Sequence, residues 1–224
     1  MFPLSDSAKA TKFPVITILL IAANIFVFFS QIFSSDPELF LYTYALIPAD
    51  VDLAVPATLI PFVTAIFLHG GILHIVSNMW FLWIFGDNVE GALSHIGYLV
   101  FFIIAGIAGN VMQYLFMPDS TIPLVGASGA IAGILGYYAV VFPRSKVRTL
   151  IFLFFFVTVI NISAFLVLGY WFVLQIFSGV ESLGMAQDEG GVAFWAHIGG
   201  FIAGLIAGVL FKPKKLEYNT ERYL

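Results

Sequence analysis

Long apolar stretches dominate this chain and limit what it can fold into. Six of them, each close to the roughly 20 residues that a helix needs to cross a bilayer, follow one another with shorter polar segments between them. They cover residues 14–33, 68–86, 96–117, 125–142, 148–173 and 192–211. Backbone polar groups in lipid must be satisfied within the spanning segment, so such stretches fold as helices. The sequence therefore predicts an all-α membrane protein with a bundle of six transmembrane helices.

The composition agrees with that of a membrane protein. Of the 224 residues, 61% are hydrophobic and 10% are charged, which is more apolar surface than a soluble domain of this size can hide. Cysteine is absent, so disulfides and thiolate metal sites are excluded. There is no basic run suited to nucleic acid. The first stretch is longer than a signal-peptide core and has no small-residue cleavage site, so we expect a retained helix.

The basic residues orient the bundle. With six crossings, all nine Lys and Arg residues fall on one side, whereas five or seven crossings would divide them. They are Lys9, Lys12, Arg144, Lys146, Arg148, Lys212, Lys214, Lys215 and Arg222. By the positive-inside rule both termini are cytoplasmic. We expect a short cytoplasmic N-terminus at 1–13, a helical bundle at 14–211 and a cytoplasmic tail at 212–224.

Unexpected polar residues meet at one depth in this layout. The second, fourth and sixth stretches all begin on the outer side, where they carry His69, His74 and Asn78, then Ser128, then His197. Ionisable or strongly polar side chains inside a membrane are costly and mark functional sites. The orientation rests on Lys, Arg and apolar length alone, so this convergence is independent of it.

Ser128 and His197 both lie beside glycines. Gly126 and Gly129 flank the serine and Gly200 follows the histidine. Small residues at four-residue spacing let helix backbones approach closely, and proton transfer between Ser and His needs about 2.6–3.2 Å. A lone serine in an apolar helix more often bonds a carbonyl one turn back, and a glycine run is more often only a packing face. The two residues together, at one depth, favour a nucleophile and its base.

His74 and Asn78 are four residues apart and share a helix face. Both can donate hydrogen bonds toward the negative oxygen that develops in acyl transfer. The backbone N–H of Ser128, near a helix N-terminus, is a third candidate donor. The alternative is a hydrogen bond that only joins two helices. His69 lies off this face beside two glycines, and we interpret it as a loop organiser.

The remaining polar residues receive structural interpretations. We expect Asn110 and Gln113 to bond neighbouring helices. Glu90 and His95 lie near the cytoplasmic end of the second stretch, where charge is readily solvated. Trp171 is interpreted as an interfacial anchor.

These motifs resemble the signature of rhomboid intramembrane serine proteases. The resemblance rests on Gly126-Ala127-Ser128-Gly129, on Ala196-His197-Ile198-Gly199-Gly200, and on His69, His74 and Asn78, with Gly86 and Glu90 following. It covers the whole membrane region in the right order. Each motif alone would be weak, but together they are specific.

The resemblance implies a Ser–His dyad without an acidic third member, a cofactor or a metal. Ser128 would be the nucleophile and His197 the general base and acid. His74, Asn78 and the Ser128 N–H would form the oxyanion hole. Supporting residues would be His69, Gly126, Gly129, Gly200 and Glu90. Substrates would be transmembrane segments of other proteins, and the location a prokaryotic plasma membrane.

Two departures from the family pattern bear on the site. Many bacterial members carry Trp-Arg in the first loop, where this chain has Ile60-Pro61. Many also carry a Tyr that stacks on the catalytic histidine, where this chain has Ala132. Something else must therefore hold the imidazole of His197.

Two other functions, and an inactive relative of the family, are less consistent with these residues. A transporter or channel could use the histidines as a proton or metal path, but they lie at one depth and no mid-membrane carboxylate completes a coupling site. A zinc hydrolase would need HExxH, whereas His69 and His74 are five apart. An inactive relative of the family would not be expected to keep both Ser128 and His197.

The fifth stretch is the expected route for substrate entry. It has no glycine between residues 148 and 168, so we expect it to pack loosely and to act as a lateral gate. In this layout Phe165 to Trp171 lies at the depth of the site. The resemblance implies that its neighbour across the opening is the second stretch near Ser77.

Overall fold

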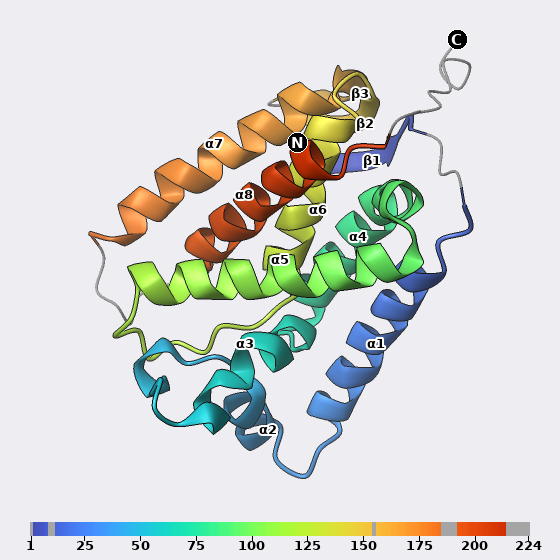
Figure 1. The fold of residues 1–224 in the computed structure, drawn as a ribbon. Helices are drawn as coiled ribbons and strands as arrows, with labels where there is room; N and C mark the ends of the chain where they lie inside the picture. Colours follow the sequence, from blue (N-terminus) through green and yellow to red (C-terminus); the bar gives the residue numbers. More distant parts are fainter. Residues whose placement is uncertain (1, 9–11, 154–155, 185–191, 214–224) are drawn as a thin grey trace.

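The computed structural model describes residues 2–8, 12–153, 156–184 and 192–213, and most of them are helical (Figure 1). The longer helices are α1 (Val15–Ile32), α2 (Pro37–Tyr44), α4 (Ile72–Leu93), α5 (His95–Phe116), α6 (Ser128–Val141), α7 (Ala164–Ser182) and α8 (Phe194–Leu210). Short turns between α2 and α4 are η1 (Pro48–Asp50), η2 (Pro56–Leu59), α3 (Pro61–Thr64) and η3 (Ala65–Phe67). The strands are β1 (Phe2–Asp6), β2 (Lys146–Leu153) and β3 (Phe156–Ser163).

Three described helices, α1, α5 and α7, are long and apolar enough to cross a membrane. The segment Pro56–Phe67 and α4 would together count as a fourth, bent by 76°. Helices α6 and α8 are apolar but have only 14 and 17 residues. At about 1.5 Å per residue both are shorter than the roughly 30 Å hydrocarbon layer. The helical membrane fold is therefore found, while the number of six crossings stays a prediction.

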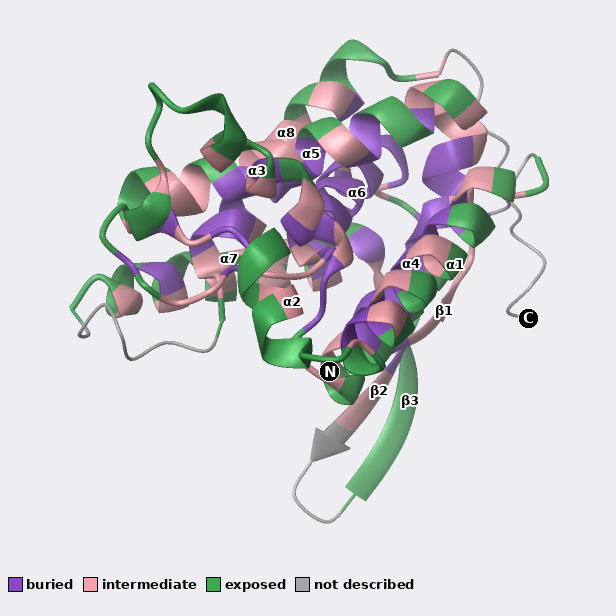
Figure 2. Cartoon of the chain, turned by 90° about the horizontal axis from the view of Figure 1, so that it is seen from below, coloured by how far each residue is buried: buried purple, intermediate pink, exposed green. Residues whose placement is uncertain are grey.

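Helix α6 forms the centre of the molecule. Every residue from Gly129 to Ala139 is buried, and Figure 2 shows α6 surrounded by the other long helices. Its closest partner is α8, because a Cβ on Gly200 would overlap the carbonyl oxygen of Gly129, and one on Gly204 would overlap that of Gly133. The expectation that these glycine faces bring two helices together is confirmed.

The C-terminal end of α4 differs from expectation. The side chain of Glu90 is fully buried and accepts hydrogen bonds of 2.8 Å from the backbone N–H groups of Ile16 and Thr17. His95 also bonds this carboxylate through Nδ1. The interpretation of Glu90 as a solvated group was wrong, because the first turn of α1 has N–H groups without helical acceptors and the carboxylate satisfies them. The side chain of His95 remains 42% exposed. Glu90 therefore has a structural role in joining α1 to α4.

The expected helix at 148–173 is wrong over residues 148–153 and 156–163. Strands β2 and β3 form an antiparallel hairpin there, and α7 begins only at Ala164. The run from Val157 to Ile160 is β-branched throughout, which favours a strand over a helix. Phe165 is consequently in the first turn of α7. Residues 154–155, which had been assigned to this helix, lie outside the described residues.

The N-terminus also contributes structure that the sequence did not predict. Strand β1 pairs with β2, so that the sheet order is β1-β2-β3. The indole of Trp80 donates to the carbonyl of Pro3 over 2.8 Å, and Asn88 and Tyr138 donate to the carboxylate of Asp6. Burial, with the nearby charge of Asp87, raises the pKa of Asp6 to about 7.

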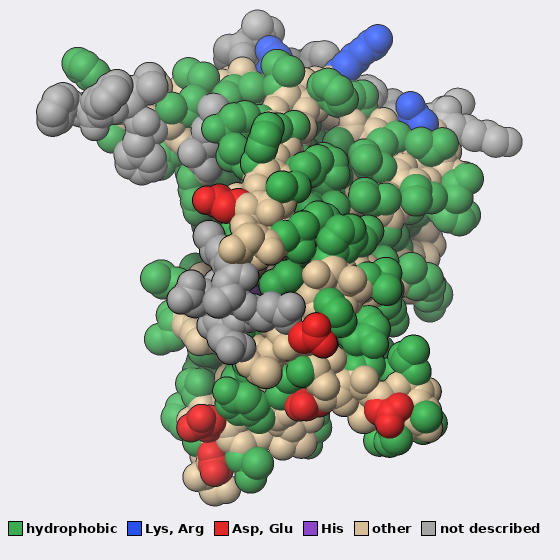
Figure 3. Space-filling model, turned by 90° about the vertical axis from the view of Figure 1, so that its left-hand side faces the viewer, with side chains coloured by type: hydrophobic (Ala, Val, Ile, Leu, Met, Phe, Trp, Pro, Cys, Tyr) green, Lys and Arg blue, Asp and Glu red, His purple; other side chains and the backbone are tan. Residues whose placement is uncertain are grey.

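Charge is unevenly distributed over the surface. On the face seen in Figure 3, Lys and Arg side chains lie at one end and the acidic side chains lie away from it, most of them at the opposite end. This separation agrees with the charge pattern used to orient the helices. Residues 214–224 of the expected tail and 185–191 of the expected last outer loop lie outside the described residues.

Candidate active site

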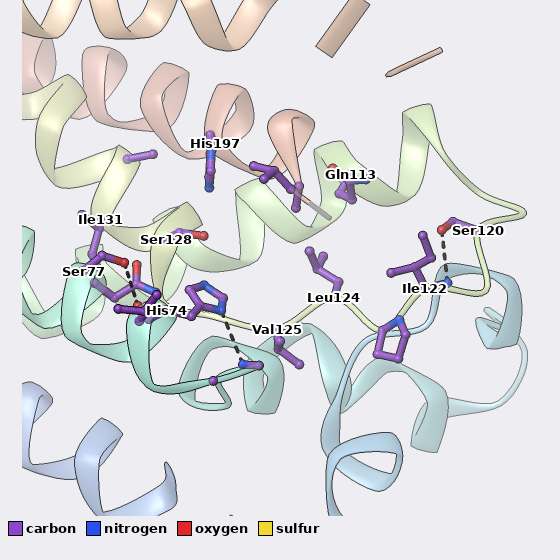
Figure 4. A pocket seen from close by; sticks show the side chains of 18 of the residues that line it. His74, Ser77, Gln113, Ser120, Ile122, Leu124, Val125, Ser128, Ile131 and His197 are labelled. Atoms are coloured by element: carbon purple, nitrogen blue, oxygen red, sulfur yellow. Dashed lines mark hydrogen bonds between the residues drawn. The ribbon is translucent and has the colours of Figure 1, made fainter. Parts of the chain in front are cut away.

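One cavity brings the candidate catalytic residues together. It has a volume of about 1030 Å³ and is lined by His74 and Asn78 from α4, Ser128 from α6 and His197 from α8. In Figure 4 the side chains of Ser128 and His197 enter it from neighbouring helices. Four of the five residues that the sequence assigned to one depth therefore share one cavity, and His69 is the exception.

Backbone contacts fix the ends of α6 and α8. A Cβ on Gly129 would lie 3.4 Å from the carbonyl oxygen of Ala196, so the residues next to Ser128 and His197 touch. The loop before α6 is held by a 2.9 Å hydrogen bond from Gly126 N to Ala65 O. Gln113 accepts a hydrogen bond from Ala196 N over 3.3 Å, as expected for a residue that joins helices. Both side chains of the proposed dyad thus project from anchored helix N-termini.

Three N–H donors lie near the start of α6. They are Nε2 of His74, Nδ2 of Asn78 and the backbone N–H of Ser128. The Nδ1 of His74 accepts a long hydrogen bond of 3.4 Å from Gly70 N, which leaves the proton of a neutral imidazole on Nε2. Gly126 has φ +120°, and a Cβ there would lie 2.7 Å from this Nε2 and 3.6 Å from Asn78 Nδ2. Only glycine permits this backbone conformation and approach.

Asn78 Nδ2 is buried, and no described residue accepts a hydrogen bond from it. Ser128 is the first residue of α6, so its N–H has no acceptor within the helix. An unpaired buried donor is costly, and donors held ready for an oxyanion are arranged in this way.

His69 packs against His74 and lies outside the cavity lining. Its side chain is fully buried, and its ring meets His74 edge-on with the centroids 5.1 Å apart. Its carbonyl accepts a hydrogen bond of 3.0 Å from Gln31 of α1. His69 does not line the cavity, so its contacts suit a residue that supports His74 and the loop before α4.

Sequence reasoning missed the partner of His197. The Nδ1 of this ring lies 2.7 Å from Oε1 of Gln175 on α7. Trp171, four residues earlier, lies with its ring centroid 5.8 Å from that of His197 and lines the cavity. The contact of Trp171 with His197 was not expected from the sequence, and its interpretation as an interfacial anchor stays a prediction. An amide within the apolar part of α7 was the available signal for Gln175.

Comparison with known proteins agrees with the motifs. A rhomboid-domain profile matches residues 56–214. The rhomboid protease GluP of Bacillus subtilis is 31% identical over 164 residues, which are 72% of this chain and 28% of that protein. Rhomboid protein 1, mitochondrial, of Saccharomyces cerevisiae is 26% identical over 189 residues, which are 83% of this chain and 50% of the relative. RHOMBOID-like protein 6, mitochondrial, of Arabidopsis thaliana is 29% identical over 154 residues, 68% of this chain and 44% of the relative.

The chain thus spans between about a quarter and a half of the length of these relatives. They include a bacterial and two mitochondrial proteins, which gives no support to the narrower expectation of a prokaryotic plasma membrane. The apolar helices and the domain match together make this an integral membrane protein. Since the profile covers most of the sequence, including Ser128 and His197, the chain belongs to the rhomboid family.

Proposed function

We propose that this chain is an intramembrane serine endopeptidase that hydrolyses peptide bonds in or near transmembrane segments of other proteins. The observation that carries the proposal is the common cavity of Ser128 and His197, with the backbones of α6 and α8 in contact beside them. Membership of a family that includes a rhomboid protease of Bacillus subtilis supports the reaction class.

The proposed chemistry is acyl transfer in two steps. His197 takes the proton of Ser128 as the hydroxyl oxygen attacks the scissile carbonyl. The negative oxygen of the tetrahedral intermediate accepts hydrogen bonds from His74 Nε2, Asn78 Nδ2 and the Ser128 N–H. His197 then protonates the leaving amine, and a water activated by the same ring hydrolyses the acyl-enzyme. The cavity would supply this water from the outer side.

The proposed topology has six crossings with both termini in the cytoplasm. The short central helix α6 would begin below the outer surface, which places Ser128 within the membrane depth. Substrates would enter from the lipid. A peptide bond in a regular helix is shielded by its hydrogen bonds, so substrates should carry helix-weakening residues such as Gly or Pro near their outer ends.

A polytopic transporter or channel with a histidine-lined site is the alternative. The cavity gathers His74 and His197 at one place, whereas a proton or ion path needs polar groups distributed across the bilayer. Nothing in the described geometry favours that alternative over hydrolysis.

Covalent labelling tests the proposal directly. The full chain in detergent or liposomes is treated with a fluorophosphonate and assayed on a model transmembrane substrate. We expect an adduct on Ser128, and we expect Ser128→Ala and His197→Ala to abolish cleavage while the unfolding temperature is kept. Chelators should have no effect. Normal turnover by either variant would overturn the dyad, and inactivation by EDTA that zinc restores would favour a metal hydrolase.

A further inference from the structure

Helix α7 presents two side chains to His197. Trp171 and Gln175 are four residues apart and therefore lie on one helix face, and both contact the imidazole. Ala132 lines the same cavity from α6 but has no ring that could stack on His197. The support for the imidazole thus comes from α7.

We propose that Gln175 is a positioning residue that fixes the tautomer and orientation of the His197 ring, an inference that rests on the proposed Ser–His dyad. The Oε1 of an amide can only accept a hydrogen bond. With Oε1 at 2.7 Å, Nδ1 must carry the ring proton. Nε2 of the neutral ring is then unprotonated and can accept the proton of Ser128.

The orientation of the amide decides whether the ring can act as a base. A Gln175 turned by 180° would donate its NH₂ to Nδ1, and the ring proton would move to Nε2. That tautomer has no free acceptor toward Ser128, so proton transfer from the serine would fail. The same logic makes the aspartate of a Ser-His-Asp triad important for the tautomer and orientation of its histidine. Here an uncharged amide would perform that task.

The competing explanation is that Gln175 only satisfies its own polarity. An amide in an apolar helix needs a hydrogen-bond partner, and His197 could be that partner without any catalytic consequence. Under this explanation, replacing Gln175 by an apolar residue of similar length would leave turnover and the His197 tautomer unchanged. The two explanations therefore differ in measurable quantities.

The kinetic test compares Gln175→Met with Gln175→Glu in the full chain. Methionine has a similar length but lacks a strong acceptor, whereas glutamate keeps an oxygen at the position of Oε1. We expect Gln175→Met to lower kcat by at least about tenfold with little change in KM, and Gln175→Glu to restore part of the loss. Leu174→Met and Ile176→Met are matched controls, because these neighbours are 42% and 40% exposed. Both controls should keep the wild-type kcat.

The spectroscopic test reads the tautomer in the wild-type protein itself. Nitrogen-15 NMR of labelled histidine distinguishes protonated from unprotonated ring nitrogens, and the His197 signals are those lost in His197→Ala. We expect a protonated Nδ1 and an unprotonated Nε2 at neutral charge. In Gln175→Met we expect the Nε2–H tautomer to appear.

The outcomes separate this inference from the proposed function. A wild-type Nε2–H tautomer, or full kcat in Gln175→Met, would overturn the role of Gln175 while Ser128-dependent cleavage stands. A loss of kcat that Gln175→Glu does not relieve, with the tautomer unchanged, would assign Gln175 to packing and also overturn it. Absence of any Ser128-dependent cleavage in the wild type would instead refute the dyad on which the inference rests.

Discussion

Adding one methyl group at Gly200 should separate the two proposed catalytic side chains. A Cβ there would lie 2.8 Å from the carbonyl carbon of Gly129, and closer still to its oxygen. Carbon atoms prefer separations of about 3.5–4.0 Å, so α8 would have to move away from α6 by about 1 Å. Because Gly129 follows Ser128 and Gly200 lies one turn after His197, this displacement acts on both ends of the dyad.

The expected magnitudes follow from this displacement. Overpacking a tight contact typically destabilises a protein by about 1–3 kcal/mol. A misplacement of about 1 Å near reacting groups can lower the rate by about 10²-fold. We therefore expect Gly200→Ala to unfold at a lower temperature and to lose about two orders of magnitude in kcat. Thermal unfolding in detergent and cleavage of a transmembrane substrate measure the two effects.

Gly169→Ala is the matched control. It makes the same change within a helix, but a Cβ at Gly169 would meet nothing within 4 Å. Alanine also favours a helix over glycine by about 0.5–1 kcal/mol, so this variant should be as active as the wild type and no less stable. If Gly200→Ala kept both the unfolding temperature and the kcat of the wild type, the contact between α6 and α8 would not position the dyad.

Two further predictions concern the donors and the N-terminal strand. Asn78→Ala should lower kcat by about 10²–10³-fold, as loss of one oxyanion donor typically does, and a change confined to KM would make Asn78 a binding residue instead. The raised pKa of Asp6 means that the folded protein holds its proton more tightly than the unfolded chain, so stability should be greatest below about pH 4 and should fall as the pH rises toward about 7. Asp6→Asn should remove this dependence in thermal unfolding between pH 4 and 8, and an equally steep dependence in the variant would assign it to another group.

Much of the fold could be predicted because a helix that crosses lipid needs a long apolar run, which is visible in the sequence. Apolar length located α1 and α5, and the glycines after Ser128 and His197 indicated the contact between α6 and α8. The hairpin was missed because an unbroken apolar run gives the same length signal whether it is helical or extended. Its β-branched stretch from Val157 to Ile160 was the available clue.

The sequence predicted the candidate residues of the site better than it predicted the residues that hold them in place. Ser128, His197, His74 and Asn78 were expected together because each is polar where lipid makes polarity costly, and they do line one cavity. Their catalytic roles stay predictions. Gln175 was missed because it is a single amide that belongs to no spacing motif. Only tertiary packing places it against His197.

The pairing of β1 with β2 has a consequence for the order of folding. Phe2 lies opposite Leu150 in this sheet, so β1 cannot pair with β2 until α1, α4, α5 and α6 have all been synthesised. Closing so long a loop costs conformational entropy that only the finished contacts repay. We therefore expect β1 to complete its pairing with β2, and its full set of contacts with Trp80, Asn88 and Tyr138, late in biogenesis. Strand β1 would then dock onto helices that are already assembled. Protection of its backbone amides from hydrogen exchange would therefore report that the bundle is complete.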